Sequence, residues 1–144
     1  IREAISIGMT GNGEIWDVAD YQKCRDISGC DSFMIGRGAV AAPDLANRIK
    51  AFENGKHLPK ESWADVLSML LAYRDLMAAD GASENHQAGR IKQWMALIRK
   101  SHVQGVQCFD EIKRIRAIDE LCAKLRHDMS LPENQRQSDL IAAE

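Results

Sequence analysis

The sequence lacks any apolar run of the roughly 18 to 20 residues that a membrane-spanning helix needs. Its first residues also lack the basic segment and following apolar segment that mark a secretory signal peptide. Proline is scarce, at three of 144 residues, and glycine accounts for ten, which excludes collagen-like and low-complexity proteins. We therefore expect a cytoplasmic, globular protein with no membrane partner.

Metal-binding and redox motifs are also missing. The four cysteines, Cys24, Cys30, Cys108 and Cys122, form no C-x-x-C pair, and the four histidines have unrelated spacings. This pattern excludes a zinc ribbon and a redox-active cysteine pair. We expect free thiols in a reducing compartment and no metal site.

Charges of both signs are present, but they are unevenly distributed. The formal net charge of the whole chain is −2. Residues 85–116 nevertheless carry seven basic and two acidic side chains, whereas residues 1–84 carry nine and thirteen and residues 117–144 carry three and six. A basic block within an acidic background is the pattern expected of an anion-binding surface.

The first forty residues alternate between strand-like and helix-like patterns. Alternating apolar residues at 5–9 predict a strand that ends in a glycine turn at 11–13. Asp17 can cap a helix that ends near residue 28, and residues 33–38 predict a second strand with its own glycine turn. This order predicts a βαβ unit. Because two strands alone do not form a stable sheet, we expect the rest of the sheet to come from elsewhere.

After Pro43 the pattern becomes helical. It predicts a short helix to about residue 50 and an amphipathic helix over residues 60–79, which stops near Gly81. Two further apolar stripes follow at helical spacing. They comprise Ala88, Ile91, Met95 and Ile98, and then Phe109, Ile112 and Ile115. Together these segments predict an antiparallel helical bundle.

The glycine pair around Arg37 is a candidate phosphate-binding segment. Glycine at the end of a parallel strand lets the backbone approach a phosphate closely, and Arg37 adds a fixed positive charge. Ordinary turns are the alternative interpretation, since short glycine pairs are weak signals. Glycine turns at two successive strand ends favour the phosphate site, because barrel enzymes often hold a phosphate between the loops after their last two strands.

Several short strings of the sequence are similar to those of a known family. They are Asn12-Gly13-Glu14-Ile15-Trp16, Gly29-Cys30-Asp31, Met34-Ile35-Gly36-Arg37-Gly38-Ala39 and Arg90-Ile91-Lys92-Gln93-Trp94. The first three resemble the flavin-binding end of the barrel in tRNA-dihydrouridine synthases. The fourth resembles the C-type subfamily, and the resemblance covers about residues 5–116.

This resemblance implies a fold class: the last βαβ unit of a TIM barrel followed by an all-α helical bundle, mostly helical overall. Residues 1–42 are expected to be the C-terminal end of a TIM-barrel FMN-binding domain, and residues 43–127 a helical tRNA-binding domain. Residues 128–144 are expected to form a polar tail. Since the chain starts with Ile1 inside a strand pattern, we expect a C-terminal fragment that can self-associate through exposed barrel edges.

The resemblance also implies an activity. In the family, FMN reduced by NADPH reduces a D-loop uridine of tRNA to dihydrouridine, at the sixteenth position for the C-type. The positions Asn12, Gly13, Glu14, Gly36 and Arg37 match the family's FMN-binding positions. The general-acid cysteine lies upstream in the family and none of the cysteines here matches it, so we expect no catalytic residue in this chain and no activity from the fragment alone.

Three basic residues match tRNA-contacting positions of the C-type: Arg90, Lys92 and Lys113. Lys113 stands where the family tends to have arginine, which keeps the charge but loses the planar fork of a guanidinium. Leu97 stands where a tyrosine is expected. At about 100° per residue, Arg90 and Lys92 flank the apolar stripe of their helix on opposite sides. A solvated charged face is the alternative interpretation of these cations.

Two other functions remain compatible with the sequence. One is a non-catalytic helical module that binds structured RNA by shape and charge. The other is a different FMN or sugar-phosphate barrel enzyme with an unrelated helical appendage. Bound flavin in the full-length protein distinguishes the tRNA-dihydrouridine synthase from the RNA-binding module.

Overall fold

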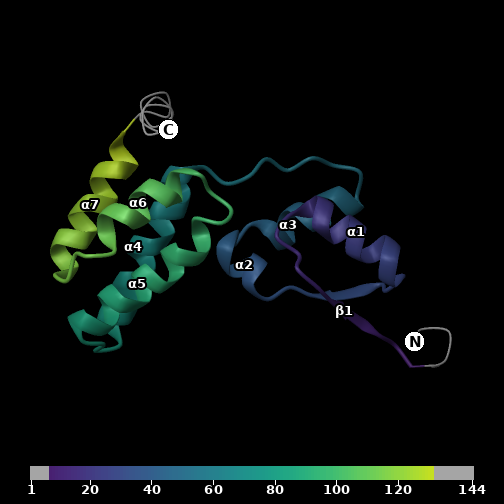
Figure 1. Ribbon diagram of the computed structural model, residues 1–144, viewed down its shortest axis with the longest axis horizontal. Helices are drawn as coiled ribbons and strands as arrows, with labels where there is room; N and C mark the ends of the chain where they lie inside the picture. The colour runs from purple at the N-terminus through teal and green to yellow at the C-terminus, as the bar shows by residue number, and fades with distance from the viewer. Residues whose placement is uncertain (1–6, 132–144) are drawn as a thin grey trace. The chain divides into compact units, whose positions relative to one another are not determined.

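The protein is described here from a computed structural model, which describes residues 7–131. The chain divides into two compact units, Ile1–Lys60 and Glu61–Glu144 (Figure 1). Each unit has its own apolar core. In the described part of the chain, no helix is both long and apolar enough to cross a membrane.

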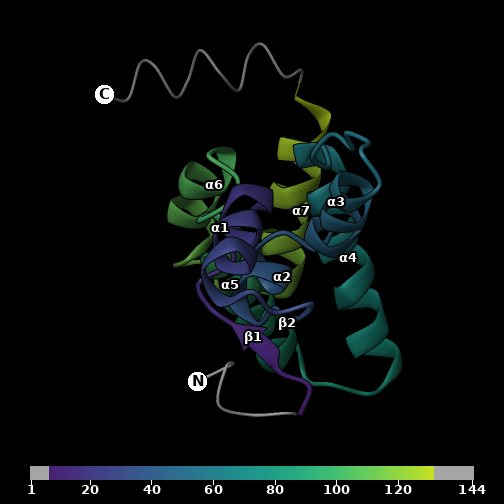
Figure 2. The same cartoon turned by 90° about the vertical axis from the view of Figure 1, so that its right-hand side faces the viewer.

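The first unit begins with a βαβ arrangement, as the sequence predicts. Strands β1 (Thr10–Asn12) and β2 (Ser32–Met34) pair in parallel, with helix α1 (Val18–Ser28) between them in sequence (Figure 2). The Asp17 side chain caps α1 by accepting a hydrogen bond from the Asp20 N–H at 2.8 Å. Gly29 ends α1 in the left-handed conformation, at a φ of 61°.

Strand β1 lies later in the chain than predicted. Residues 7–9 form no strand, and the earlier part of the predicted segment lies outside the described residues. Instead, Gly11 of the expected glycine turn pairs with Phe33 in the sheet. A Cβ on Gly11 would lie 2.8 Å from the Phe33 ring, so the glycine allows the ring to lie against the backbone of β1. This packing places Gly11 in the strand.

A helix replaces the second predicted glycine turn. Helix α2 (Arg37–Ala41) starts directly after Gly36, and helix α3 (Leu45–Glu53) follows it. The core of this unit consists of Ile15, Tyr21, Ala42, Leu45 and Ile49. Since two of these residues belong to α3, this helix packs with the βαβ segment. The compact unit therefore includes α3 and extends to Lys60.

The second unit is a bundle of helices around one core (Figure 1). It contains α4 (Trp63–Ala79), α5 (Glu84–Ile98), α6 (Gln104–Ile112) and α7 (Ile118–Ser130). Ser62 caps α4 and Ser83 caps α5, each through its side-chain oxygen. The largest fully buried side chains of this core are Leu67, Leu70, Ile91, Met95, Ile98, Ile112, Leu121 and Leu125.

The last part of the bundle differs from the sequence prediction in two respects. The apolar stripe that starts at Phe109 is divided, because α6 ends at Ile112 and α7 begins at Ile118. Helix α7 then continues to Ser130, although we expected the polar tail to start at residue 128. Asp128 is buried and forms an ion pair with Lys124, four residues earlier. This pair stabilises the last turn of the helix. Most of the predicted tail lies outside the described residues.

Candidate functional site

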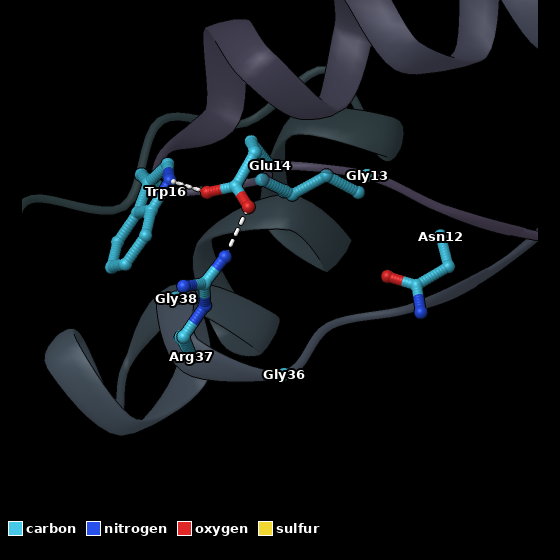
Figure 3. Close-up of a pocket in the computed structure, with 8 residues that line it drawn as sticks. Asn12, Gly13, Glu14, Trp16, Gly36, Arg37 and Gly38 are labelled. Carbon is cyan, nitrogen blue, oxygen red and sulfur yellow. Dashed lines mark hydrogen bonds and ion pairs between the residues drawn. The ribbon is translucent and has the colours of Figure 1, made fainter.

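The segments that follow the two strands form one pocket (Figure 3). Because β1 and β2 are parallel, their carboxyl ends lie at the same edge of the sheet. The cavity has a volume of about 480 Å³. Its lining includes all five residues that the sequence predicts for the cofactor, together with three neighbours: Asn12, Gly13, Glu14, Gly36 and Arg37, and then Ile15, Trp16 and Gly38.

Gly38 is the residue at which the two segments touch. A Cβ at this position would lie 1.9 Å from the Ile15 carbonyl oxygen, so only glycine allows the backbone of α2 to come this close. At Gly36, in contrast, a Cβ would meet nothing within 4 Å. The motif from Gly36 to Gly38 thus combines one glycine that makes a tight contact with one that leaves open space.

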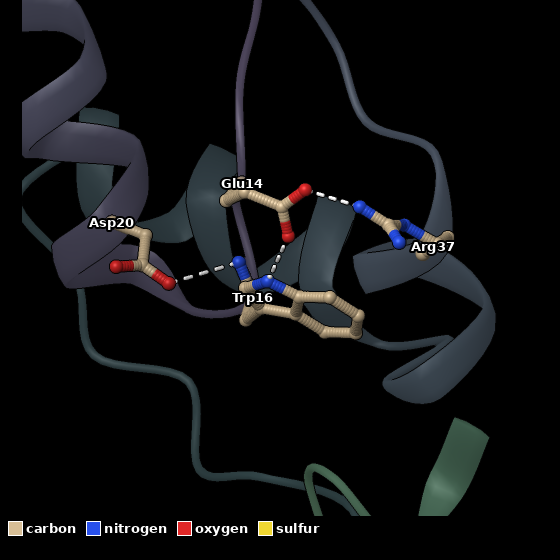
Figure 4. Close-up of polar contacts among 4 residues, drawn as sticks. All are labelled: Glu14, Trp16, Asp20 and Arg37. Atoms are coloured by element: carbon tan, nitrogen blue, oxygen red, sulfur yellow. Dashed lines mark hydrogen bonds and ion pairs between the residues drawn. The ribbon is translucent and has the colours of Figure 1, made fainter. Parts of the chain in front are cut away.

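A polar network connects the two segments (Figure 4). The Glu14 carboxylate accepts hydrogen bonds from the Arg37 guanidinium and from the Trp16 indole N–H, the latter at 2.8 Å. The Arg37 guanidinium carbon also lies 5.7 Å from the centre of the Trp16 ring. The Trp16 backbone N–H donates to the Asp20 carboxylate at 3.0 Å. Trp16 therefore helps to orient the side chain of Arg37.

No role for Trp16 or Gly38 follows from the sequence alone. Both belong to motifs that were visible in the sequence, since Trp16 ends the string that starts at Asn12 and Gly38 is the second glycine of its pair. Their functions depend on contacts between residues more than twenty positions apart. Only the folded chain shows such contacts.

The pocket has features that suit the phosphate end of FMN. A guanidinium offers five N–H donors, and Glu14 occupies one nitrogen of Arg37, so donors remain for a phosphate. Both charged side chains are about two-thirds exposed, so their ion pair is screened by water and can be rearranged by an anion. The open space at Gly36 lets a phosphate approach the backbone. These residues fit the cofactor that the resemblance implies.

The predicted tRNA-contacting residues lie in the second unit. Arg90, on α5, donates from Nε to the Tyr73 hydroxyl of α4 at 3.4 Å and from Nη1 to the Gln93 amide oxygen at 3.0 Å. The Tyr73 ring packs edge-to-face with Trp94, with ring centres 5.1 Å apart. These contacts hold Arg90 on the α4 side of α5. Lys92 is half-buried on the same helix.

Lys113 is found at a different place in the bundle. It follows the last residue of α6, and its Nζ lies 2.6 Å from the Asp110 carboxylate. A hydrogen bond from Lys113 and its positive charge are the largest causes that lower the pKa of Asp110. Arg90 and Lys113 thus contact different neighbours in the described residues, and their binding of tRNA stays a prediction.

Comparison with known proteins defines the class of this chain. A profile described as dihydrouridine synthase (Dus) matches residues 1–131. The chain belongs to the dihydrouridine synthase family, which confirms the resemblance seen in its motifs.

Individual relatives refine this assignment. The chain is 34% identical over 121 residues to a protein of Neisseria meningitidis serogroup B and 34% identical over 125 residues to one of Pseudomonas putida. It is 35% identical over 123 residues to a protein of Shewanella oneidensis. Each is named tRNA-dihydrouridine(16) synthase. The matches cover 84% of this chain for the Neisseria and Shewanella proteins and 87% for the Pseudomonas protein. They cover only 36%, 36% and 37% of those three proteins, respectively, so the chain spans well under half their length.

Proposed function

We propose that this chain is the C-terminal part of a flavin-dependent tRNA-dihydrouridine synthase. The enzyme reduces a D-loop uridine of tRNA, at the sixteenth position, with FMN that NADPH has reduced. The observation that carries the proposal is the family match over residues 1–131, because the relatives at 34–35% identity are named for this modification. The barrel origin of the βαβ segment belongs to the same proposal.

In this proposal, the pocket of the first unit holds the phosphate of FMN. Arg37 neutralises the phosphate charge, and Gly13 and Gly36 allow it to approach the backbone. Glu14 and Trp16 hold the guanidinium of Arg37 toward the pocket (Figure 3). When bound, the flavin supplies the hydride chemistry. The general acid is expected from a part of the enzyme other than this chain.

The second unit binds tRNA in this proposal. Its basic residues Arg90, Lys92 and Lys113 contact phosphates, which makes the affinity salt-dependent. Arg90 is restrained by two side-chain hydrogen bonds, so little side-chain entropy is lost when it binds a phosphate.

A second function is favoured by one observation. The basic block lies in a unit with its own apolar core, as expected for a helical module that binds RNA without catalysis. Such a module would bind tRNA equally well, but the intact protein would contain no flavin.

The test uses the intact enzyme that carries this chain, purified without added cofactor. A flavin absorption spectrum is expected, together with NADPH-dependent gain of two hydrogens at uridine 16 of an unmodified tRNA transcript, measured by mass spectrometry. A transcript with cytidine at that position is the matched control and should gain none. Tight tRNA binding without flavin and without dihydrouridine would instead support the RNA-binding module.

A further inference from the structure

Arg99 lies where the end of α5 meets the first turns of α6. A Cβ on Gly105 would lie 2.9 Å from the Arg99 Cα, so the two backbones are in direct contact here. One helical turn later, the Phe109 ring lies under the Arg99 guanidinium, whose central carbon is 4.4 Å from the ring centre. Gly105 and Phe109 are four residues apart and therefore share one face of α6. Together they fix Arg99 from its backbone to its guanidinium.

The acidic side chains near Arg99 are already engaged by other cations. Asp110 pairs with Lys113 at 2.6 Å, and Glu111 pairs with Lys124 of α7 at 2.6 Å. These are the two acidic residues of the basic block 85–116. Among residues 7–131, no carboxylate lies within ion-pair distance of Arg99 or Arg114. This surface therefore retains an excess of positive charge.

Arg114 belongs to the same local cluster of charges. The pKa of Asp110 is lowered chiefly by the hydrogen bond and charge of Lys113, and further by the charges of Arg99 and Arg114. Lys113 contacts this carboxylate directly, at 2.6 Å, and Arg114 is the next residue after Lys113 at the end of α6. Arg99, Lys113 and Arg114 are all exposed to solvent, so the cluster is accessible to a large ligand.

This cluster is distinct from the contacts of Arg90. Lys92 and Arg99, the C-cap residue of α5, are seven residues apart and therefore lie along one edge of this helix, and Arg99 contacts α6. Arg90 lies on the opposite edge, where it contacts Tyr73 of α4. Arg90 and Arg99 thus contact different neighbouring helices, α4 and α6 respectively.

We propose that Arg99, held on the face of Phe109, and Arg114 bind phosphate groups of the tRNA backbone. This inference rests on the proposed function, and it adds a contact area to the positions that the family motif assigns. Stacking on a ring uses the flat face of a guanidinium and leaves its in-plane N–H groups free. Two of these N–H groups can donate hydrogen bonds to two oxygens of one phosphate. Because the cluster combines exposed guanidiniums with a single supporting ring, it suits a charged backbone better than an apolar peptide.

The experiment measures the tRNA affinity of the intact enzyme that carries this chain as a function of KCl concentration. Arg99→Ala and Arg114→Ala should each reduce the salt slope by about 0.9 and weaken binding about fivefold at about 0.15 M salt, as counterion release predicts for one lost phosphate contact. Arg126→Ala is the matched control, because Arg126 is an exposed arginine of α7, and it should leave the slope unchanged.

Phe109 is a positioning residue in this proposal, so its variants separate stacking from simple packing. Phe109→Tyr keeps the aromatic face and should retain the affinity, whereas Phe109→Leu should reproduce the loss seen with Arg99→Ala. Circular dichroism of both variants should show an intact helical bundle. Equal affinity of the tyrosine and leucine variants would contradict the role of the ring.

The outcomes distinguish this inference from the proposed function. If Arg90→Ala weakens tRNA binding and Arg99→Ala and Arg114→Ala do not, the second contact area is wrong and the proposed function stands. If the intact enzyme without substitutions binds no tRNA, both proposals fail. If polyglutamate displaces the tRNA as effectively as unlabelled tRNA does, the surface recognises acidic polymers in general, which also overturns the inference.

Discussion

At the scale of single residues, Gly36 and Gly38 differ in how much space surrounds their Cα atoms. A Cβ on Gly38 would overlap the Ile15 carbonyl oxygen, at 1.9 Å, while a Cβ on Gly36 would meet nothing within 4 Å. Neither residue has a positive φ, so the difference arises from space and not from backbone conformation. The identity of Gly38 is therefore required by the contact between the two pocket segments.

This contrast gives a direct prediction. Gly38→Ala should lower the free energy of unfolding of the first unit by about 1 to 3 kcal/mol, because the added methyl group forces the segments apart. Gly36→Ala, the matched control, should have little effect. Hydrogen exchange of peptides that cover α1 and α3 measures the difference. Equal protection in the two variants would show that the contact is not needed for stability.

Arg37 is the cation of the pocket, so its removal should weaken the binding of FMN. In the intact enzyme that carries this chain, Arg37→Ala should raise the Kd for FMN about 10- to 100-fold, the range expected when a charged hydrogen bond is removed. Lys23→Ala, an exposed cation of α1, is the control. Flavin fluorescence measures both affinities. An unchanged Kd for Arg37→Ala would remove the phosphate role of this residue.

At the scale of elements, α6 and α7 are joined by a polar contact beside the core. Lys124 of α7 lies 2.6 Å from Glu111 of α6 and 3.1 Å from Asp128 of its own helix. Burial raises the pKa of the neighbouring Cys108 thiol, with a further contribution from the charge of Asp128. Cys108 therefore stays protonated near neutral pH, and Lys124 is the cation that neutralises Asp128.

Lys124→Met should therefore destabilise the second unit. The variant leaves the buried Asp128 carboxylate without its cation, and we expect the free energy of unfolding to fall by about 1 to 2 kcal/mol, below the cost for a fully buried pair because Lys124 is 29% exposed. Urea unfolding followed by circular dichroism measures the change. Arg126→Met, on the exposed side of α7, should change it by less than about 0.5 kcal/mol. A similar loss in both variants would contradict a specific contact at Lys124.

The ends of the helices in the second unit show which helix boundaries are determined by nearby residues in the sequence. Helix α4 ends at Ala79 with Gly81 at a φ of 77°, close to the stop that the sequence predicts. The break between α6 and α7 was not predicted, because Phe109, Ile112 and Ile115 keep a helical spacing across it. This spacing arises because Phe109, Ile112 and Ile115 all pack in or against the same core. Packing against one core does not require a continuous helix.

At the scale of the whole molecule, the proposed function assigns this pocket to only one end of FMN, the phosphate. The 144-residue chain alone should therefore bind FMN with no better than micromolar affinity, because the proposed contacts of the described lining are with the phosphate and not with the ring system. Titration of FMN with the chain, followed by flavin fluorescence, tests this, with riboflavin as the control that lacks the phosphate. Sub-micromolar binding of FMN would contradict the prediction.

The sequence by itself determined the order of elements in the βαβ segment, the start and end of α1, the helical character after Pro43 and the membership of the dihydrouridine synthase family. Caps and periodicity act within one or two turns of chain, so they can be recognised without the fold.

The tertiary structure decided the features that depend on distant residues. The Phe33 ring places Gly11 in β1, and the core around Leu45 assigns α3 to the first unit. The contact of Arg37 with Glu14 and that of Arg99 with Phe109 also exist only in the folded chain. In each case the partner lies ten or more residues away, and the fold, not local propensity, brings the two side chains together.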